Sequence, residues 1–258
     1  MSERTGYPQG TPSWADLATS DPEGARQFYG GLFGWDFDVN PDPQFGGYAQ
    51  ALLRGKTVAG VGAQQDPAAP AAWTTYLAAD DVDKVAEAVP QQGGTLAMPP
   101  MSVGEEGRMA VATDPTGAFF GLWQSGRHTG AELVNEPGTM VWHELATPDL
   151  DRATAFYSAI VGVGWSDMDT GGSGMVYKLL QVDGRTAGGA MQQQPDSGQP
   201  PYWLVYFEVA DANAAASRVT ELGGRVIDGP IDTPQGPMLV ASDPQGAVFA
   251  LIQSGSTA

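Results

Sequence analysis

Two carboxylates at matching places in the chain could do acid–base chemistry. Asp16 and Glu144 each stand two residues after a tryptophan, in the segments W-A-D-L-A-T and W-H-E-L-A-T that begin at Trp14 and Trp142. Side chains of an extended segment alternate between two faces, so each carboxylate shares a face with its tryptophan. Apolar surroundings raise the pKa of a carboxyl group toward neutrality, which suits a general acid or base. Asp16 and Glu144 are therefore candidate catalytic residues; the alternative is a structural carboxylate that accepts a backbone or indole N–H.

Composition leaves few other groups for catalysis. The chain has no cysteine, which excludes a thiol nucleophile, a disulfide, a thiolate zinc site and an iron–sulfur cluster. Its two histidines are His128, in a polar stretch, and His143, which follows Trp142 and so points to the face opposite Glu144. No Ser–His–Asp triad is expected near either carboxylate. No glycine-rich stretch carries the Lys-Ser/Thr ending of a phosphate-binding loop.

The acidic charge excludes a class of partners. The 30 Asp and Glu against 12 Lys and Arg give a net charge of −18, which repels nucleic acid and anionic lipid. No run of about 18 apolar residues is present for a membrane span, and residues 1–12 lack the apolar stretch of a signal peptide. We expect a cytoplasmic monomer or homodimer whose partner is a small molecule, without nucleic-acid or membrane contact.

An internal duplication organises the 258 residues. At an offset of 128, residues 14–34 and 142–162 are identical at nine of 21 positions. Two further blocks recur in the same order, at 73–94 with 203–224 and at 113–126 with 242–255. A repeat of this length is long enough to form a domain. The polar stretch 127–138, which ends in Pro-Gly, is the expected linker.

Each repeat divides again into two halves. Every half opens with a predicted strand that begins at a tryptophan, namely Trp14, Trp73, Trp142 and Trp203. A helix follows each strand: in the first half Asp21 can cap it, and apolar residues from Ala25 to Leu32 recur at helical spacing. Short strands joined by turns that contain glycine come next, as at 48–63 and 177–191. Strand, helix and three strands, four times over, predict an α+β fold.

These patterns resemble the glyoxalase/bleomycin-resistance/dioxygenase superfamily, also called the vicinal oxygen chelate superfamily. The resemblance rests on D-x-x-x-A-x-x-FY-x-x-x-x-G, from Asp21 and Asp149, and on DP-x-G-x-x-x-x-L, from Asp114 and Asp243. It implies four βαβββ modules paired into two curled-sheet domains, at 11–126 and 139–256, in the tandem arrangement of actinobacterial proteins. Whether a concave cup joins two halves of one repeat or one half of each repeat stays open.

The same resemblance places metal ligands at positions that this chain fills with other residues. Members that use a metal carry His or Gln seven residues before the helix-start Asp, which is Trp14 or Trp142 here. They carry Glu seven residues after the Asp of DP-x-G, which is Gly121 or Ala250, and a second His would fall at Trp73 or Trp203. None of these side chains binds a metal. We therefore expect no metal and no cofactor.

The cups are expected to be apolar and lined by aromatic rings. Alternation places these candidate ligand-binding residues inside them: Trp14, Trp73, Trp142, Trp203, Phe207, Phe119 and Trp123. Such a lining suits a flat or bulky apolar compound, although these rings could instead only fill the core. The sequence predicts a metal-independent protein that binds a small hydrophobic or aromatic compound, for sequestration or resistance, as bleomycin-resistance proteins do. The alternative is a metal-free glyoxalase-like or hydroxylase-like enzyme that uses Asp16 or Glu144 as acid and base.

Overall fold

Two repeats of similar element order make up the chain. The structure is a computed structural model that describes residues 3–42, 45–172, 174–195 and 198–255. The first repeat contains β1 (Pro12–Thr19), α1 (Pro22–Phe33), β2 (Asp36–Val39), β3 (Ala49–Leu53), β4 (Lys56–Ala63), β5 (Ala72–Ala78), α2 (Val82–Gln91), β6 (Thr95–Val103), β7 (Gly107–Thr113) and β8 (Phe119–Ser125). The second repeat contains β9 (Met140–Thr147), α3 (Leu150–Val161), β10 (Gly164–Asp167), β11 (Tyr177–Val182), β12 (Arg185–Gln192), β13 (Tyr202–Glu208), α4 (Ala212–Glu221), β14 (Arg225–Thr233), β15 (Gly236–Ser242) and β16 (Val248–Ile252).

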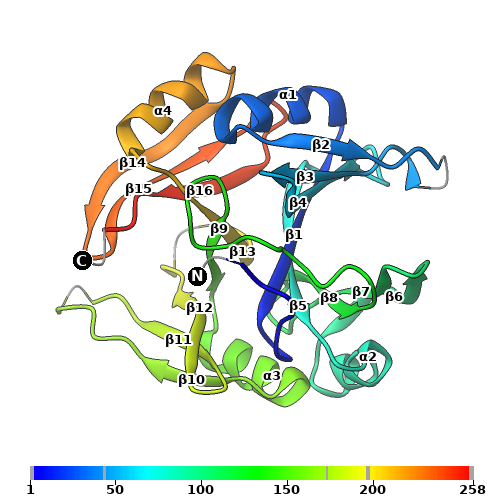
Figure 1. Ribbon diagram of the computed structural model, residues 1–258. Helices are drawn as coiled ribbons and strands as arrows, with labels where there is room; N and C mark the ends of the chain where they lie inside the picture. The colour runs from blue at the N-terminus through cyan, green and yellow to red at the C-terminus, as the bar shows by residue number, and fades with distance from the viewer. Residues whose placement is uncertain (1–2, 43–44, 173, 196–197, 256–258) are drawn as a thin grey trace.

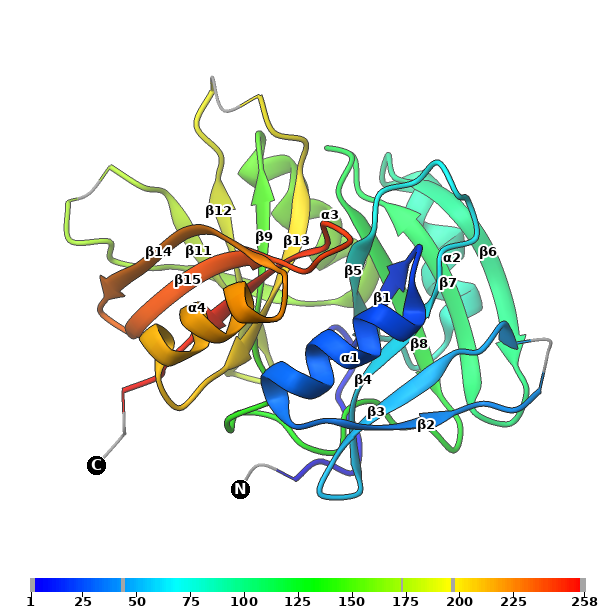
Figure 2. The ribbon, with the colours of Figure 1, turned by 90° about the horizontal axis from the view of Figure 1, so that it is seen from above.

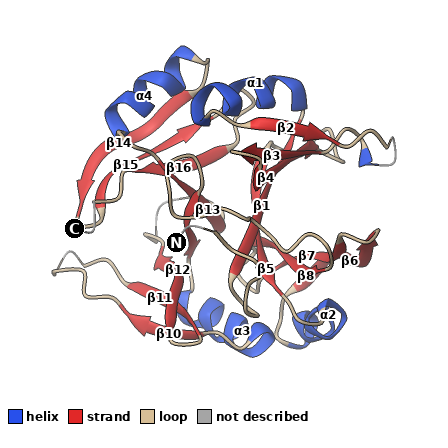
Figure 3. Cartoon of the chain, viewed as in Figure 1, coloured by secondary structure: helices blue, strands red, loops and turns tan. Residues whose placement is uncertain are grey.

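Each repeat forms one curled, eight-stranded sheet that does not close (Figures 1 and 3). The strand order is β2-β3-β4-β1-β5-β8-β7-β6 in the first sheet and β10-β11-β12-β9-β13-β16-β15-β14 in the second. At the centre of the sheets β1 pairs antiparallel with β5, and β9 with β13. The predicted α+β fold of four βαβββ modules in two curled sheets is confirmed, and both modules of a cup come from the same repeat.

The helices begin at aspartates that the sequence repeats. The side chain of each N-cap accepts a hydrogen bond from the backbone N–H three residues later, which satisfies a donor that the helix leaves free. These N-caps are Asp21, Asp81, Asp149 and Asp211. Within the described residues no helix is long and apolar enough to cross a membrane.

The helices cover the convex backs of the two sheets. α1 contacts α4 and α2 contacts α3, and the two sheets open to the right and to the left in Figure 1, away from each other. Figure 2 shows the same pairing of α1 with α4 from above. Buried side chains of both repeats, such as Leu17, Phe28 and Phe249, pack in one shared core. The convex faces are thus used for packing between the two repeats.

A chain of three hydrogen-bonding side chains crosses from the first repeat to the second. Trp73 Nε1 donates to Tyr29 Oη at 2.9 Å, and Tyr29 Oη donates to Asp243 at 3.1 Å. The other carboxylate oxygen of Asp243 accepts backbone N–H groups of its own turn, among them that of Ala247 at 2.9 Å. The tyrosine of one FY motif therefore binds the aspartate of the other repeat's DP-x-G turn.

The same chain recurs with the repeats exchanged. Trp203 Nε1 donates to Tyr157 Oη at 2.9 Å, and Tyr157 Oη donates to Asp114 of the first repeat at 3.2 Å. Tyr29 and Tyr157 are both fully buried, so each phenol depends on the opposite repeat for a partner. We call these two sets the reciprocal Trp–Tyr–Asp chains.

This arrangement corrects the predicted orientation of the β5 tryptophan. Trp14 lies seven residues before its helix N-cap Asp21, whereas Trp73 lies eight residues before Asp81. Side chains alternate along a strand, so this difference of one residue puts the two indoles on opposite faces of the sheet. The register accordingly pairs Trp73 with Leu17, which packs in the core.

The two predicted cup residues of β13 are corrected for the same reason. Trp203 lies eight residues before its N-cap and donates to Tyr157. Phe207 is fully buried in the shared core, 5.2 Å from the ring of Trp73 between centroids. The prediction that Trp73, Trp203 and Phe207 point into the cups is wrong.

Replacing Tyr29 by Phe tests the reciprocal chains. The change leaves the indole N–H of Trp73 and one oxygen of Asp243 without their partner, so the free energy of unfolding should fall by about 1–3 kcal/mol. Urea denaturation of Y29F and Y157F measures the effect in each chain, with S217A on the exposed face of α4 as the control. Stability unchanged in both tyrosine variants would show that the chains contribute nothing to the junction.

Candidate functional site: two carboxyl clusters on the concave faces

Both candidate catalytic residues lie on the concave faces. On β1, Ala15 and Leu17 pack in the core with α1, so Trp14 and Asp16 point to the opposite, concave side. The antiparallel register places Tyr76 beside Trp14 on this side. On β9, Glu144 takes the equivalent position. Asp16 and Glu144 are each half-buried.

In the second cup, Glu144 is held between two phenols. Tyr177 Oη donates to Glu144 Oε2 at 2.8 Å and Tyr206 Oη donates to Oε1 at 3.1 Å. Trp142 Nε1 donates to the Tyr177 oxygen at 2.9 Å. We call Glu144, Tyr177 and Tyr206 the second carboxyl cluster.

The first cup repeats this arrangement with a shorter acid. Tyr76 shares a hydrogen bond with Asp16, and the charge of Asp16 also acts on Tyr48. Trp14 Nε1 donates to Tyr48 Oη at 3.2 Å. Asp16, Tyr48 and Tyr76 form the first carboxyl cluster, so each cup contains one acid, two phenols and one indole N–H.

Glycines in the neighbouring strands make room for the tyrosine rings. A Cβ atom on Gly121 would lie 2.2 Å from the ring of Tyr76, and one on Gly189 would lie 2.2 Å from Tyr177 Oη. Real Cβ atoms do not approach this closely, so only glycine fits. The space above Gly121 is therefore filled by the ring of Tyr76.

Burial raises the pKa of both carboxyl groups. Loss of hydration raises the pKa of Asp16 to about 7, and the hydrogen bond with Tyr76 opposes this change in part. Loss of hydration raises the pKa of Glu144 as well, against the lowering effect of Tyr177 and Tyr206. Asp16 can therefore either donate or accept a proton near neutral pH.

Apolar side chains surround both clusters. Strand pairing extends the concave face of the first sheet to Gly121, Trp123, Met109 and Val111. In the second sheet the cluster packs with Leu204, Ala250, Val240, Met238 and Ile252. The orientation predicted for Trp14, Trp142, Trp123 and Phe119 agrees with the register, with Phe119 59% exposed at the rim. Their role as ligand-binding residues stays a prediction.

Several side chains of the cups were missed by the sequence reasoning. The four tyrosines of the clusters occur at matching places in both repeats, two of them in the blocks W-T-T-Y and W-L-V-Y that begin at Trp73 and Trp203. This repetition was the available signal. His128, assigned only to the linker, lies against the rings of Trp14 and Trp123. No local pattern indicates that contact.

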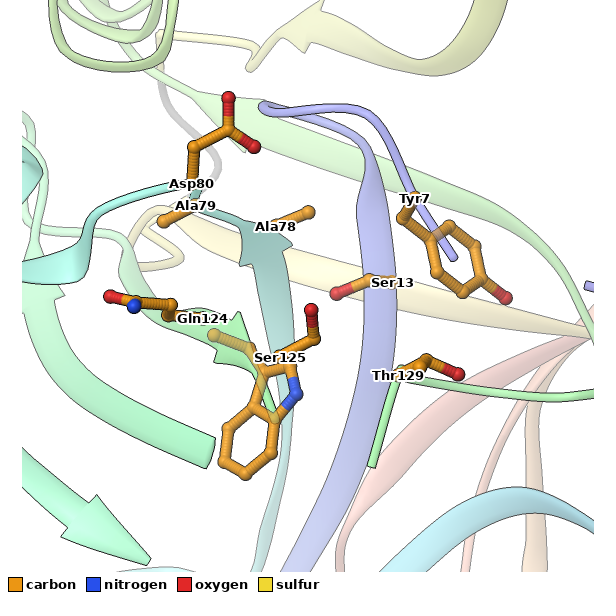
Figure 4. A pocket seen from close by; sticks show the side chains of 9 residues that line it. Tyr7, Ser13, Ala78, Ala79, Asp80, Gln124, Ser125 and Thr129 are labelled. Carbon is orange, nitrogen blue, oxygen red and sulfur yellow. The ribbon is translucent and has the colours of Figure 1, made fainter. Parts of the chain in front are cut away.

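A small polar pocket adjoins Trp123 in the first repeat (Figure 4). It measures about 180 Å³, and its wall includes Ser13, Ala78 and Ser125. In the second repeat Glu208 stands where Ala78 does, and its carboxylate accepts hydrogen bonds from the backbone and hydroxyl of Ser254. The pocket thus corresponds to space that a carboxylate fills in the other repeat. A larger groove of about 550 Å³, between α1 and α4, contains neither carboxyl cluster.

The fold and the paired motifs have counterparts among known proteins. The family model of the Glyoxalase/Bleomycin resistance protein/Dioxygenase superfamily matches residues 11–122 and 139–251. The chain belongs to this superfamily. It is 47% identical over 259 residues to "Putative glyoxylase CFP32" of Mycobacterium tuberculosis, covering 98% of both chains. It is 36% identical over 263 residues to "Anthracycline biosynthesis protein DnrV" of Streptomyces peucetius, covering 96% of this chain and 95% of that one.

Solved structures of superfamily members share the fold at low sequence identity. The Mn(II)-bound glyoxalase of Novosphingobium aromaticivorans aligns with a TM-score of 0.65 at 16% identity, over 98% of this chain and 83% of that one. The 2,3-dioxygenase LapB of Pseudomonas sp. KL28 aligns with a TM-score of 0.66 at 16% identity, over 96% and 94%. At this identity the likeness shows the fold alone.

The residues of this superfamily member do not fit a metal at the positions that the resemblance indicates. Trp14 and Gly121 supply no ligand in the first cup, and the ring of Tyr76 covers Gly121. Counting from the N-caps moves the second-half positions from Trp73 and Trp203 to Thr74 and Leu204, which are equally unsuited. Among the described residues no group of three His, Cys, Asp or Glu could hold a metal ion.

The raised pKa of Asp16 predicts a pH effect on stability. Between the ordinary aspartate pKa of about 4 and about 7, the folded chain keeps a proton that the unfolded chain has lost. The free energy of unfolding should therefore fall as pH rises through this window. In D16N this contribution is absent, so the difference in stability between D16N and wild type should grow in favour of D16N. Urea denaturation across the window measures it, and parallel curves for both proteins would contradict the raised pKa.

Proposed function

We propose that the protein binds a small aromatic or hydrophobic compound in its concave cups without a metal ion. The observation that carries this proposal is the carboxyl cluster in each repeat, in which a half-buried acid lies beside two phenols among apolar side chains. Three of the four phenols, those of Tyr76, Tyr177 and Tyr206, are buried. Binding sites of this kind combine a mostly apolar wall with a few fixed polar groups that orient the ligand.

The clusters offer both kinds of hydrogen bond to a ligand. A protonated Glu144 or Asp16 can donate to a carbonyl oxygen, and the ionised form can accept from a hydroxyl group. Trp142 and the aliphatic side chains beside it supply the surface on which a flat ring packs. A compound with fused rings and one or two oxygen substituents matches this combination.

The relatives support a ligand of this class. Two of them, at 36% identity, are named for anthracycline biosynthesis, and anthracyclines contain fused planar rings that carry carbonyl and hydroxyl groups. The superfamily also includes bleomycin-resistance proteins, whose name denotes protection against a small molecule. Sequestration or handling of such a compound is the function that we propose here.

Titration with quinizarin, a dihydroxyanthraquinone, tests the binding function. We expect quenching of the intrinsic tryptophan fluorescence with a dissociation constant on the order of micromolar, because Trp142 lines the second cup. The same titration after dialysis against EDTA should give the same constant. Absence of quenching by both quinizarin and daunorubicin would remove this ligand class from consideration.

A second candidate function is metal-free acid–base catalysis on an aromatic compound or an α-oxoaldehyde. The elevated pKa of Asp16 and of Glu144, together with the relative named as a glyoxylase, favours this candidate. Turnover in D16N or E144Q should then fall by ~10²–10⁴, the usual value of a general acid or base, while D38N on exposed β2 should keep full activity. If the protein only binds, no turnover exists to lose, and the amide variants shift affinity by at most about 1–3 kcal/mol.

A further inference from the structure

An aromatic ring from the linker already lies in the first cup. The imidazole of His128 is 4.3 Å from the ring of Trp14 between centroids, at an interplanar angle of 81°, and 5.4 Å from that of Trp123. Trp123 Nε1 also donates to the backbone oxygen of His128 at 2.9 Å. In Figure 1 the green segment between β8 and β9 crosses in front of the first sheet. The imidazole thus makes T-shaped contacts with both indoles of this cup.

The linker is fixed there by backbone hydrogen bonds. The N–H of His128 donates to the oxygen of Glu106 at 3.1 Å, and the N–H of Ala131 donates to the oxygen of Ser13 at 2.9 Å. Tyr7 Oη donates to the oxygen of Ala131 at 2.6 Å. These hydrogen bonds make linker residues 128–131 part of the wall of the first cup.

Packing, more than polar contact, holds the imidazole. His128 Nε2 is buried, and no hydrogen-bond partner for it lies in the described part of the chain. Burial lowers the pKa of His128 to about 4, with the charge of Glu132 acting weakly against this, so the ring is neutral at pH 7. We call the place between Trp14 and Trp123 the aromatic seat of the first cup. It holds a neutral, flat, aromatic group, which is also what an aromatic ligand would provide.

The equivalent seat of the second cup is less covered. Trp142 and Ile252 are the counterparts of Trp14 and Trp123; both are half-buried, whereas Trp14 is 3% and Trp123 is 7% exposed. The ring of Trp142 has no aromatic partner among the described residues, although its N–H is bonded to Tyr177.

The second cup also has an additional phenol. Tyr202 is half-buried at the position that Ala72 occupies in the first repeat, and burial, together with the charge of Glu144, raises the pKa of its phenol. Three phenols therefore surround one acid in this cup, which gives a ligand more hydrogen-bonding partners than in the first.

We infer that the two cups are not equivalent: His128 occupies the aromatic seat of the first cup, and the second cup, between Trp142 and Glu144, takes the ligand. The ligand is a flat aromatic compound that carries a hydroxyl or carbonyl group. This inference rests on the proposed function and adds to it a stoichiometry of one compound per chain and a location in the second repeat.

Isothermal titration with quinizarin tests the inference on the full chain. Wild type should bind one equivalent, and H128A should bind two, because the seat between Trp14 and Trp123 becomes free. R127A, which changes the exposed neighbouring side chain of the same linker, should still bind one. W142A should weaken binding at least tenfold, because it removes the ring on which the ligand packs.

The outcomes separate this inference from the proposed function. Two equivalents in wild type, or undiminished affinity in W142A, would overturn the inference and leave the proposed function standing. If neither wild type nor H128A binds quinizarin or daunorubicin, both the inference and the proposed function would be overturned.

A measurement without ligand adds an independent check. Acrylamide should quench the fluorescence of H128A more than that of R127A, because Trp14 and Trp123 lose their cover. Equal quenching of the two variants would show that His128 does not shield these indoles, and the inference would be wrong.

Discussion

A buried phenol at the junction of the two repeats needs a hydrogen-bond partner, and here the partner lies in the opposite repeat. Tyr29 reaches Asp243, and Tyr157 reaches Asp114. A phenol left unpaired in this core would cost about 1–3 kcal/mol, so neither repeat can satisfy its own core alone. The reciprocal Trp–Tyr–Asp chains therefore fix the helices against the opposite sheet and turn the β5 and β13 indoles toward the convex side.

The concave faces follow from this use of the convex ones. Trp73 and Trp203 pack at the junction between the repeats. Each cup therefore contains one indole from its opening strand, next to a carboxyl cluster. Phenols can share hydrogen bonds with the acid, which lowers the cost of placing it among apolar side chains. Gly121 and Gly189 make this possible, because any larger side chain would collide with a tyrosine. A hydrogen-bonding site therefore stands at the place where the resemblance puts metal ligands.

Local patterns carried most of the sequence prediction. The duplication, the helix caps and the inward side of Asp16 and Glu144 depend on neighbours in the chain, and the structure places them as expected. The orientation predicted for Trp73 was wrong because one extra residue separates it from the N-cap of its helix, which turns its side chain to the other face of the strand. Only the position of Asp81 reveals that extra residue. The contact of His128 with Trp14 joins residues 114 positions apart. Such contacts depend on the path of the linker, which no periodicity encodes.

The two repeats differ in a pattern that the physics explains. In the reciprocal chains both copies retain Trp, Tyr and Asp, because each copy completes the core of the other and a change in one leaves a buried group unpaired in its neighbour. Side chains of the concave clusters form their hydrogen bonds within one repeat, so a change in one cup leaves no buried group of the other repeat unpaired. There Asp16 matches the longer Glu144, and Ala72 matches Tyr202. Duplication with a shared core thus keeps the fold constant and lets the side chains of the two cups differ.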